Sequence, residues 1–243
     1  GRSGFARSYD VFSIPYNESQ ERFAESLEII LQAWKGKEFS YQGNHYTVEN
    51  ATVTPAPYQQ PHPPLRIAAN SADTFTRLGQ AGHPIFVGLR GMDIPELSKN
   101  VLEYRRRWRE AGHPGEGDVS LRIPVYAGET QQQAMDEPFE SISGYFGRMG
   151  NLYRERAWKA GLEVTELADD RAERLAALSY DEMLETKIAF GTAEDLVDRF
   201  TQLKEELGLD GVVAELNPGG LIPEERVLRS LRILTEKVMP AFK

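Results

Sequence analysis

Residues 65–89, LRIAANSADTFTRLGQAGHPIFVGL, contain a strand, a helix and a second strand in succession. The short apolar run from Leu65 to Ala69 predicts the first strand, and Ile85 to Leu89 predicts the second. Between them, the polar stretch Asn70-Ser71-Ala72-Asp73-Thr74 provides capping side chains for a helix that ends at Gly82. Two strands joined by a helical crossover are expected to lie parallel in one sheet.

The same alternation continues to the end of the chain. A third strand is predicted at 119–127, where Pro124 interrupts the run, and a fourth at 211–216, where Glu215 is the one charged residue. Strands that alternate with helices favour a parallel sheet covered by helices, either doubly wound or closed into a barrel. The remaining helix signals are Asp93 with Pro95 for 93–112, a charged helical stretch from Thr130 to about Glu185, Thr192 for 192–208, and Pro223 for a last helix to Pro240.

The part before residue 65 follows a different pattern. Asn17 is the expected N-cap of a helix that carries apolar residues at helical spacing and stops at Gly36. Residues 39–48 predict a β-hairpin with a glycine-containing turn. Five prolines between 55 and 64 predict an extended connector, because proline fixes φ and lacks the backbone donor.

Composition points to a small-molecule ligand. The net charge of -9 disfavours nucleic acid and an anionic membrane surface as partners. The absence of cysteine excludes disulfides, zinc–thiolate sites and a thiol nucleophile, and is compatible with the expected cytoplasmic location. The four histidines show no metal-ligand spacing, and no nucleophile elbow or phosphate-binding P-loop motif is present, so no metal is assigned.

The order of several motifs resembles that of the luciferase-like (bacterial luciferase type) flavin-dependent monooxygenases. Each motif is loose by itself, but together they cover nearly the whole chain, most weakly between about 140 and 185. The motifs are Gly1-Arg2-Ser3-Gly4, the helix 22–34 with Arg22, Phe23 and Trp34, the hairpin 39–46, the proline- and glutamine-rich connector 55–65, Gly191-Thr192, and Val238-Met239-Pro240.

The resemblance implies a TIM (β/α)8 barrel, with residues 1–243 as one partial barrel domain that covers roughly strands 5 to 8. Only four strand–helix units are counted, whereas a closed barrel needs eight. At roughly 30 residues per unit, about 120 residues are therefore expected before Gly1. Segment 139–185 is an expected insertion that could act as a lid.

The resemblance also implies an oxidoreductase in which reduced FMN and oxygen act on a small organic substrate. A separate flavin reductase would supply the electrons, and a homo-oligomer is expected. A deazaflavin-dependent enzyme of the same fold, which transfers hydride, is one alternative, and a non-catalytic flavin-binding or partner-binding remnant is another. The family's catalytic side chains lie largely on earlier strands, so none is assigned in this chain.

The strongest candidate for cofactor binding is the loop with Asn70, Ser71 and Thr74. A strand end that leads into a helix start brings free amides, hydroxyls and the positive end of the helix dipole together, which suits a phosphate. The resemblance places the flavin phosphate on these three residues and adds the guanidinium of Arg2. Ordinary helix capping is the alternative, and Asp73 brings a negative charge close to the loop.

Two further positions carry weaker predictions. Residues Asn217-Pro218-Gly219-Gly220 follow the fourth strand and could form a second phosphate loop, or simply a turn into the last helix. Arg226, one turn into that helix, is a candidate for binding an anionic substrate, with a solvated helix arginine as the alternative.

Overall fold

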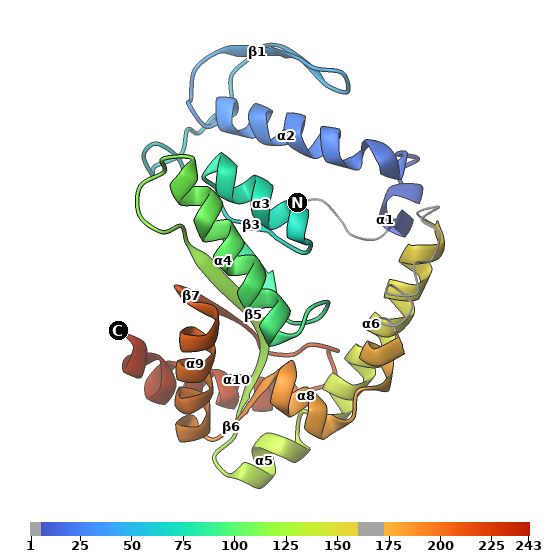
Figure 1. Ribbon diagram of the computed structural model, residues 1–243, viewed down its shortest axis with the longest axis vertical. Coiled ribbons are helices and arrows are strands. Elements are labelled where there is room, and N and C mark those ends of the chain that lie inside the picture. Colours follow the sequence, from blue (N-terminus) through green and yellow to red (C-terminus); the bar gives the residue numbers. More distant parts are fainter. Residues whose placement is uncertain (1–5, 160–172) are drawn as a thin grey trace. The chain divides into compact units, whose positions relative to one another are not determined.

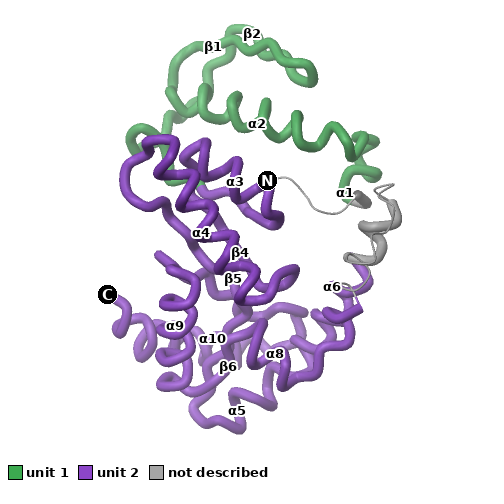
Figure 2. The backbone as a smooth tube through the Cα atoms, in the orientation of Figure 1, with its two compact units in different colours: residues 1–65, 155–164 green, residues 66–154, 165–243 purple. Residues whose placement is uncertain are grey.

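The computed structural model describes residues 6–159 and 173–243 (Figure 1). The chain divides into two compact units, one formed by residues 1–65 and 155–164 and the other by 66–154 and 165–243 (Figure 2). The expectation of one domain over 1–243 stays a prediction, as does that of a lid at 139–185.

The first unit contains a helix and a hairpin. Its elements are α1 (Ala6–Asp10), the 3-10 turn η1 (Tyr16–Glu18), α2 (Ser19–Ala33), β1 (Phe39–Gln42) and β2 (Thr47–Ala51). The antiparallel pairing of β1 with β2 confirms the predicted hairpin, whose turn donates three backbone amides to the carboxylate of Glu25. The predicted cap at Asn17 is wrong, because Asn17 lies inside the 3-10 turn and α2 begins after Glu18.

The second unit contains the parallel sheet. Its strands are β3 (Ile67–Ala68), β4 (Ile85–Gly88), β5 (Val119–Ala127), β6 (Ala189–Gly191) and β7 (Gly211–Glu215), and every pair among them is parallel. Its principal helices are α3 (Ala72–Ala81), α4 (Ile94–Glu110), α5 (Gln131–Asp136), α6 (Phe139–Lys159), α8 (Tyr180–Thr186), α9 (Ala193–Leu207) and α10 (Glu224–Ile233).

Strand β5 is the centre of the sheet, with β4 on one side and β7 on the other. Its first half pairs with β4 from Val119 to Arg122, and its last three residues, from Val125, pair with β6. Pro124 lies between these two stretches. It is in register with Glu215 at the end of β7, so the missing N–H falls after the β4 pairing, at the last position of the β7 pairing and before the β6 pairing begins, where a long central strand tolerates it.

The two faces of β5 differ in character. Alternate residues from Val119 to Ala127 are buried in a core built from α3, α4, α9 and α10. On the opposite face, which carries Ser120 and Arg122, the Arg122 side chain is 55% exposed. The other residues of β5 on that face are nevertheless buried, and Tyr126 packs there in a second core with residues of α6 and α8, so Arg122 is the one exposed residue of the strand.

Most predicted strands and caps are confirmed, with adjusted boundaries. Asp93 accepts the Glu96 amide at 2.8 Å, and Thr192 forms a capping box with Asp195. The strand predicted at 65–69 is reduced to β3, and the three-residue strand β6 was not predicted. The last helix is α10, which continues as a π-helical turn at Leu234–Val238 and a 3-10 turn at Met239–Phe242.

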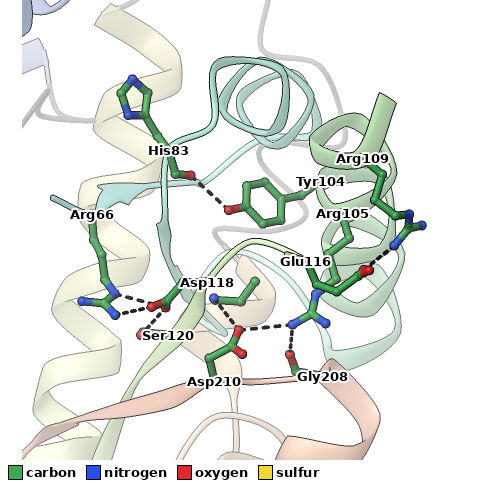
Figure 3. A network of polar contacts seen from close by, with 11 residues as sticks. Arg66, His83, Tyr104, Arg105, Arg109, Glu116, Asp118, Ser120, Gly208 and Asp210 are labelled. Atoms are coloured by element: carbon green, nitrogen blue, oxygen red, sulfur yellow. Dashed lines mark hydrogen bonds and ion pairs between the residues drawn. The ribbon is translucent and has the colours of Figure 1, made fainter. Parts of the chain in front are cut away.

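A polar network closes the amino ends of the strands (Figure 3). Arg66, next to β3, forms an ion pair with Asp118, next to β5. Asp210, which precedes β7, accepts the amide of Val119 at 2.8 Å and pairs with Arg105 of α4 at 3.2 Å. These charges neutralise one another, so this end of the sheet is built for stability.

The central position of β5 leads to a stability prediction. Leu121→Ala removes a fully buried side chain from the middle of the sheet and should lower the free energy of unfolding by about 2–5 kcal/mol. Leu102→Ala is the matched control on α4, because that leucine is 66% exposed, and it should change stability by less than about 0.5 kcal/mol. Urea denaturation followed by circular dichroism measures both, and equal midpoints for the two variants would contradict this account of the core.

Candidate active site

Ser71 and Thr74 lie together where β3 leads into α3. Ser71 occupies the N-cap position, and its carbonyl accepts the amides of Thr74 and Phe75. Its hydroxyl makes no capping bond and instead lies 2.8 Å from the hydroxyl of Thr74. Two hydroxyls are therefore held side by side at the amino end of a ten-residue helix, where the positive end of the dipole favours an anion.

The negative charge of Asp73, the residue before Thr74, has an arginine partner. Its carboxylate pairs with Arg77, one turn further along α3, at 2.9 Å. Asn70 is exposed beside Ser71. Arg2, the fourth residue predicted for this site, lies outside the described residues.

A second polar group lies at the carboxyl ends of the strands and was missed by sequence reasoning. Glu215, the last residue of β7, forms ion pairs with Arg90, which follows β4, and with Arg122 of β5 at 2.5 Å. The guanidinium of Arg90 lies over the ring of Tyr145 in α6, 5.2 Å from its centroid. The sequence does contain a signal for this group, because each of two apolar strands carries a single charged residue, Arg122 in one and Glu215 in the other.

Arg226 belongs to a third polar group, centred on Glu137. Arg229 and the hydroxyl of Tyr126 donate to Glu137, and the Nε of Arg226 lies 3.8 Å from its carboxylate. Burial alone would raise the pKa of Glu137, but the bonds from Tyr126 and Arg229 hold it below its usual value. Burial, with the bond to Glu137, raises the pKa of Tyr126 to about 12.

The loop 217–220 uses much of its polar capacity internally. The Asn217 side chain bonds the amide and the carbonyl of Ile222, and the Ser141 hydroxyl bonds the Pro218 carbonyl at 2.8 Å and the Leu221 amide at 3.1 Å. Gly219 has a φ of +102°, and a Cβ there would clash with the Ser141 carbonyl. This arrangement favours the turn over a second phosphate loop, and it fastens the start of α6 to the end of β7.

The described part of the chain contains neither a metal-type cluster nor a membrane-spanning helix. Within residues 6–159 and 173–243, no three His, Cys, Asp or Glu side chains gather as a metal site would require. No helix in the same ranges combines the length and apolarity needed to cross a membrane.

The Glu137 group gives a pH prediction. Because the folded pKa of Glu137 lies below the ordinary value of 4.5, its stabilisation is complete above that pH and is lost as the pH falls through the folded value. Glu137→Gln should therefore lower the unfolding free energy by about 1–3 kcal/mol at pH 7, and the difference from wild type should shrink below about pH 4.

Glu110→Gln is the matched control for this measurement. Glu110 also meets arginines, but it is a half-exposed residue on α4, so its loss should cost less than about 1 kcal/mol. Urea titrations at several pH values measure both variants. A pH-independent difference for Glu137→Gln would show that ionisation of this carboxyl does not contribute.

Known proteins resemble this chain in sequence. The model of the luciferase-like monooxygenase family matches residues 1–211. The oxygenase component of a flavin-dependent trigonelline monooxygenase from Acinetobacter baylyi is 24% identical over 225 residues, which cover 91% of this chain and 60% of the relative.

Solved structures share the fold at low sequence identity. The monooxygenase RslO1 from Streptomyces bottropensis superposes with a TM-score of 0.69 at 23% identity, over 100% of this chain and 68% of that one. The coenzyme F420-dependent tetrahydromethanopterin reductase from Methanopyrus kandleri gives a TM-score of 0.65 at 17% identity, over 95% of this chain and 65% of that one. This chain spans 60 to 68% of the length of these three proteins. Since the family model covers most of its residues and its parallel α/β sheet is shared with these structures, the chain belongs to the luciferase-like monooxygenase family.

Proposed function

We propose that this chain binds reduced FMN and takes part in oxidation of a small organic substrate by molecular oxygen. The observation that supports this proposal most directly is the hydroxyl pair of Ser71 and Thr74. The pair lies at the amino end of α3, which follows the carboxyl end of the parallel strand β3. Ligands of parallel α/β folds bind at this end of the strands.

The donors at this point fit a phosphate group. Two hydroxyls and the first amides of α3 can donate, and the nearby carboxylate of Asp73 is engaged by Arg77. Ser71, Thr74 and Asn70 would hold the phosphate, with Arg2 as an additional partner. Bound reduced FMN would supply the electrons for oxygen activation, while the protein positions the cofactor and controls the charge around it.

Two finer statements belong to the same proposal. Strands β3, β4 and β5 lie side by side in chain order, and β6 and β7 each pair with β5, all in parallel; this row of parallel strands supports a (β/α)8 barrel. A flavin reductase would be the electron source, a proposal supported by a relative described as an oxygenase component.

The main competing function is hydride transfer with a deazaflavin cofactor. It is favoured by the similarity in fold to the F420-dependent reductase. The Ser71–Thr74 pair does not discriminate between the two cofactors, because both carry a phosphate that such a site would bind. A direct comparison of binding is therefore the decisive measurement.

Fluorescence titration of the purified chain with FMN and with a deazaflavin tests the proposal. FMN should bind more tightly than the deazaflavin. Thr74→Val and Ser71→Ala should each weaken FMN binding roughly tenfold, since each removes a donor to a charged group.

Thr76→Val is the control for these variants. It makes the same chemical change in the same helix, but the Thr76 hydroxyl bonds back to the Ala72 carbonyl and is not part of the pair. FMN affinity should be unchanged in it. Tighter binding of the deazaflavin would transfer the assignment to hydride transfer, and a folded chain that binds neither cofactor would support a partner-binding remnant.

A further inference from the structure

The turn of the β-hairpin is fastened to helix α2 by a carboxylate of that helix. The backbone amides of Asn44, His45 and Tyr46 all donate to Glu25, at distances of 2.7 to 3.1 Å. A Cβ at Gly43 would lie 2.3 Å from the same carboxylate, so glycine is needed for the turn to approach this closely. The hairpin is thus held to the helix at one point by three backbone bonds.

His45 adds a second contact, in which its imidazole lies between two further carboxylates. Its Nε2 lies 3.1 Å from an oxygen of Glu21, and its Nδ1 lies 3.5 Å from an oxygen of Glu18. These glutamates and Glu25 are three and four positions apart, so their side chains share one face of the helix. The imidazole is only 13% exposed. We refer to the turn 43–46 with these three glutamates as the hairpin clasp.

The protonation state of the imidazole decides whether both of its contacts are favourable. An ionised carboxylate only accepts hydrogen bonds, whereas a neutral imidazole has one N–H donor and one lone pair. A neutral His45 can therefore bond one of its two carboxylates and must turn a lone pair toward the other. The imidazolium donates from both nitrogens, so it alone satisfies Glu18 and Glu21 together.

The charges around His45 favour its protonation as well. In the described residues, the charged groups that face it come from η1 and α2, namely the carboxylates of Glu18, Glu21 and Glu25 and the guanidinium of Arg22. Arg22 pairs with Glu18 at 2.7 Å and lies over the ring of Tyr46, 5.7 Å from its centroid. Three negative charges and one positive charge leave an excess of -2 around a neutral His45, and protonation reduces that excess to -1.

Glu25 supplies the part of the hairpin clasp that does not depend on this proton. Burial alone would raise the pKa of Glu25, but the bonds from the three amides hold it below its usual value. Its carboxylate is therefore ionised throughout the range in which histidines change charge, about pH 5 to 8. The hairpin clasp combines a permanent anchor with a contact that changes with pH.

We propose that His45 is a pH-sensitive switch that tightens the hairpin on α2 when it is protonated. At low pH the imidazolium bonds both Glu18 and Glu21, and the stability that these bonds add is fully present. As the pH rises and the ring becomes neutral, one of the two contacts turns repulsive and that stability is lost. The hairpin then stays bonded through Glu25 but opens more often. No step of this switch requires a cofactor.

Hydrogen–deuterium exchange of the whole chain, without added ligand, tests the switch. Protection of the hairpin, residues 39–51, is compared at about pH 5.5 and about pH 8, after correction for the intrinsic exchange rate at each pH. Wild-type protection should be roughly fivefold greater at the lower pH, which is the size expected for an ion pair near the surface.

Three variants assign the change to this contact. His45→Gln cannot become charged in this range, so its protection should be the same at both pH values. Glu21→Gln should retain most of its protection at the higher pH, because an amide can donate to a neutral imidazole as well as accept from a charged one. His62→Gln is the matched control in the same unit, where the Nδ1 of His62 lies 2.8 Å from the Pro63 carbonyl, and it should keep the wild-type pH dependence.

Three results would overturn the switch. The first is equal protection of the wild-type hairpin at both pH values. The second is a pH difference that persists in full in a His45→Gln variant whose circular dichroism shows that it is folded. The third is loss of the difference in His62→Gln as well, since the effect would then not arise at the contact of His45 with its two carboxylates.

Discussion

The central constraint in this protein is the pairing of β5 on both sides. Its nine residues hold β4 and β7 at one end and β6 at the other, so every other strand of the described parallel sheet except β3 is hydrogen-bonded to it directly. Parallel strands require crossover connections, and the helices that provide them bury one face of β5 completely. The position of each strand end, and hence of each loop, follows from this one strand.

The two ends of the sheet serve different purposes because of how their charges are arranged. At the amino end, Arg66 with Asp118 and Arg105 with Asp210 form balanced pairs that tie strands and helices together. At the carboxyl end, the hydroxyls of Ser71 and Thr74 lie at a helix start, and Glu215 at the end of β7 is shared by Arg90 and by Arg122 of β5. Balanced charge suits stability, whereas free donors suit ligand binding.

The site is not assembled from one motif. The loop proposed to hold a phosphate is a local feature of residues 70–74, while the ion pairs of Glu215 in β7 bring together Arg122 of β5 and Arg90, which follows β4. Their common basis is the meeting of parallel strand ends at one edge of the sheet.

The sequence by itself determined the alternation of strands and helices, the parallel sheet and the family. It also determined caps such as Asp93 and Thr192, because these depend on bonds between residues three apart. Only the tertiary structure decided that Ser71 bonds Thr74 instead of capping the helix, and that the three-residue β6 completes β5. It alone joined Arg90 to Glu215 across 125 positions, since sequence periodicity shows which face a residue occupies but not which distant residue meets it there.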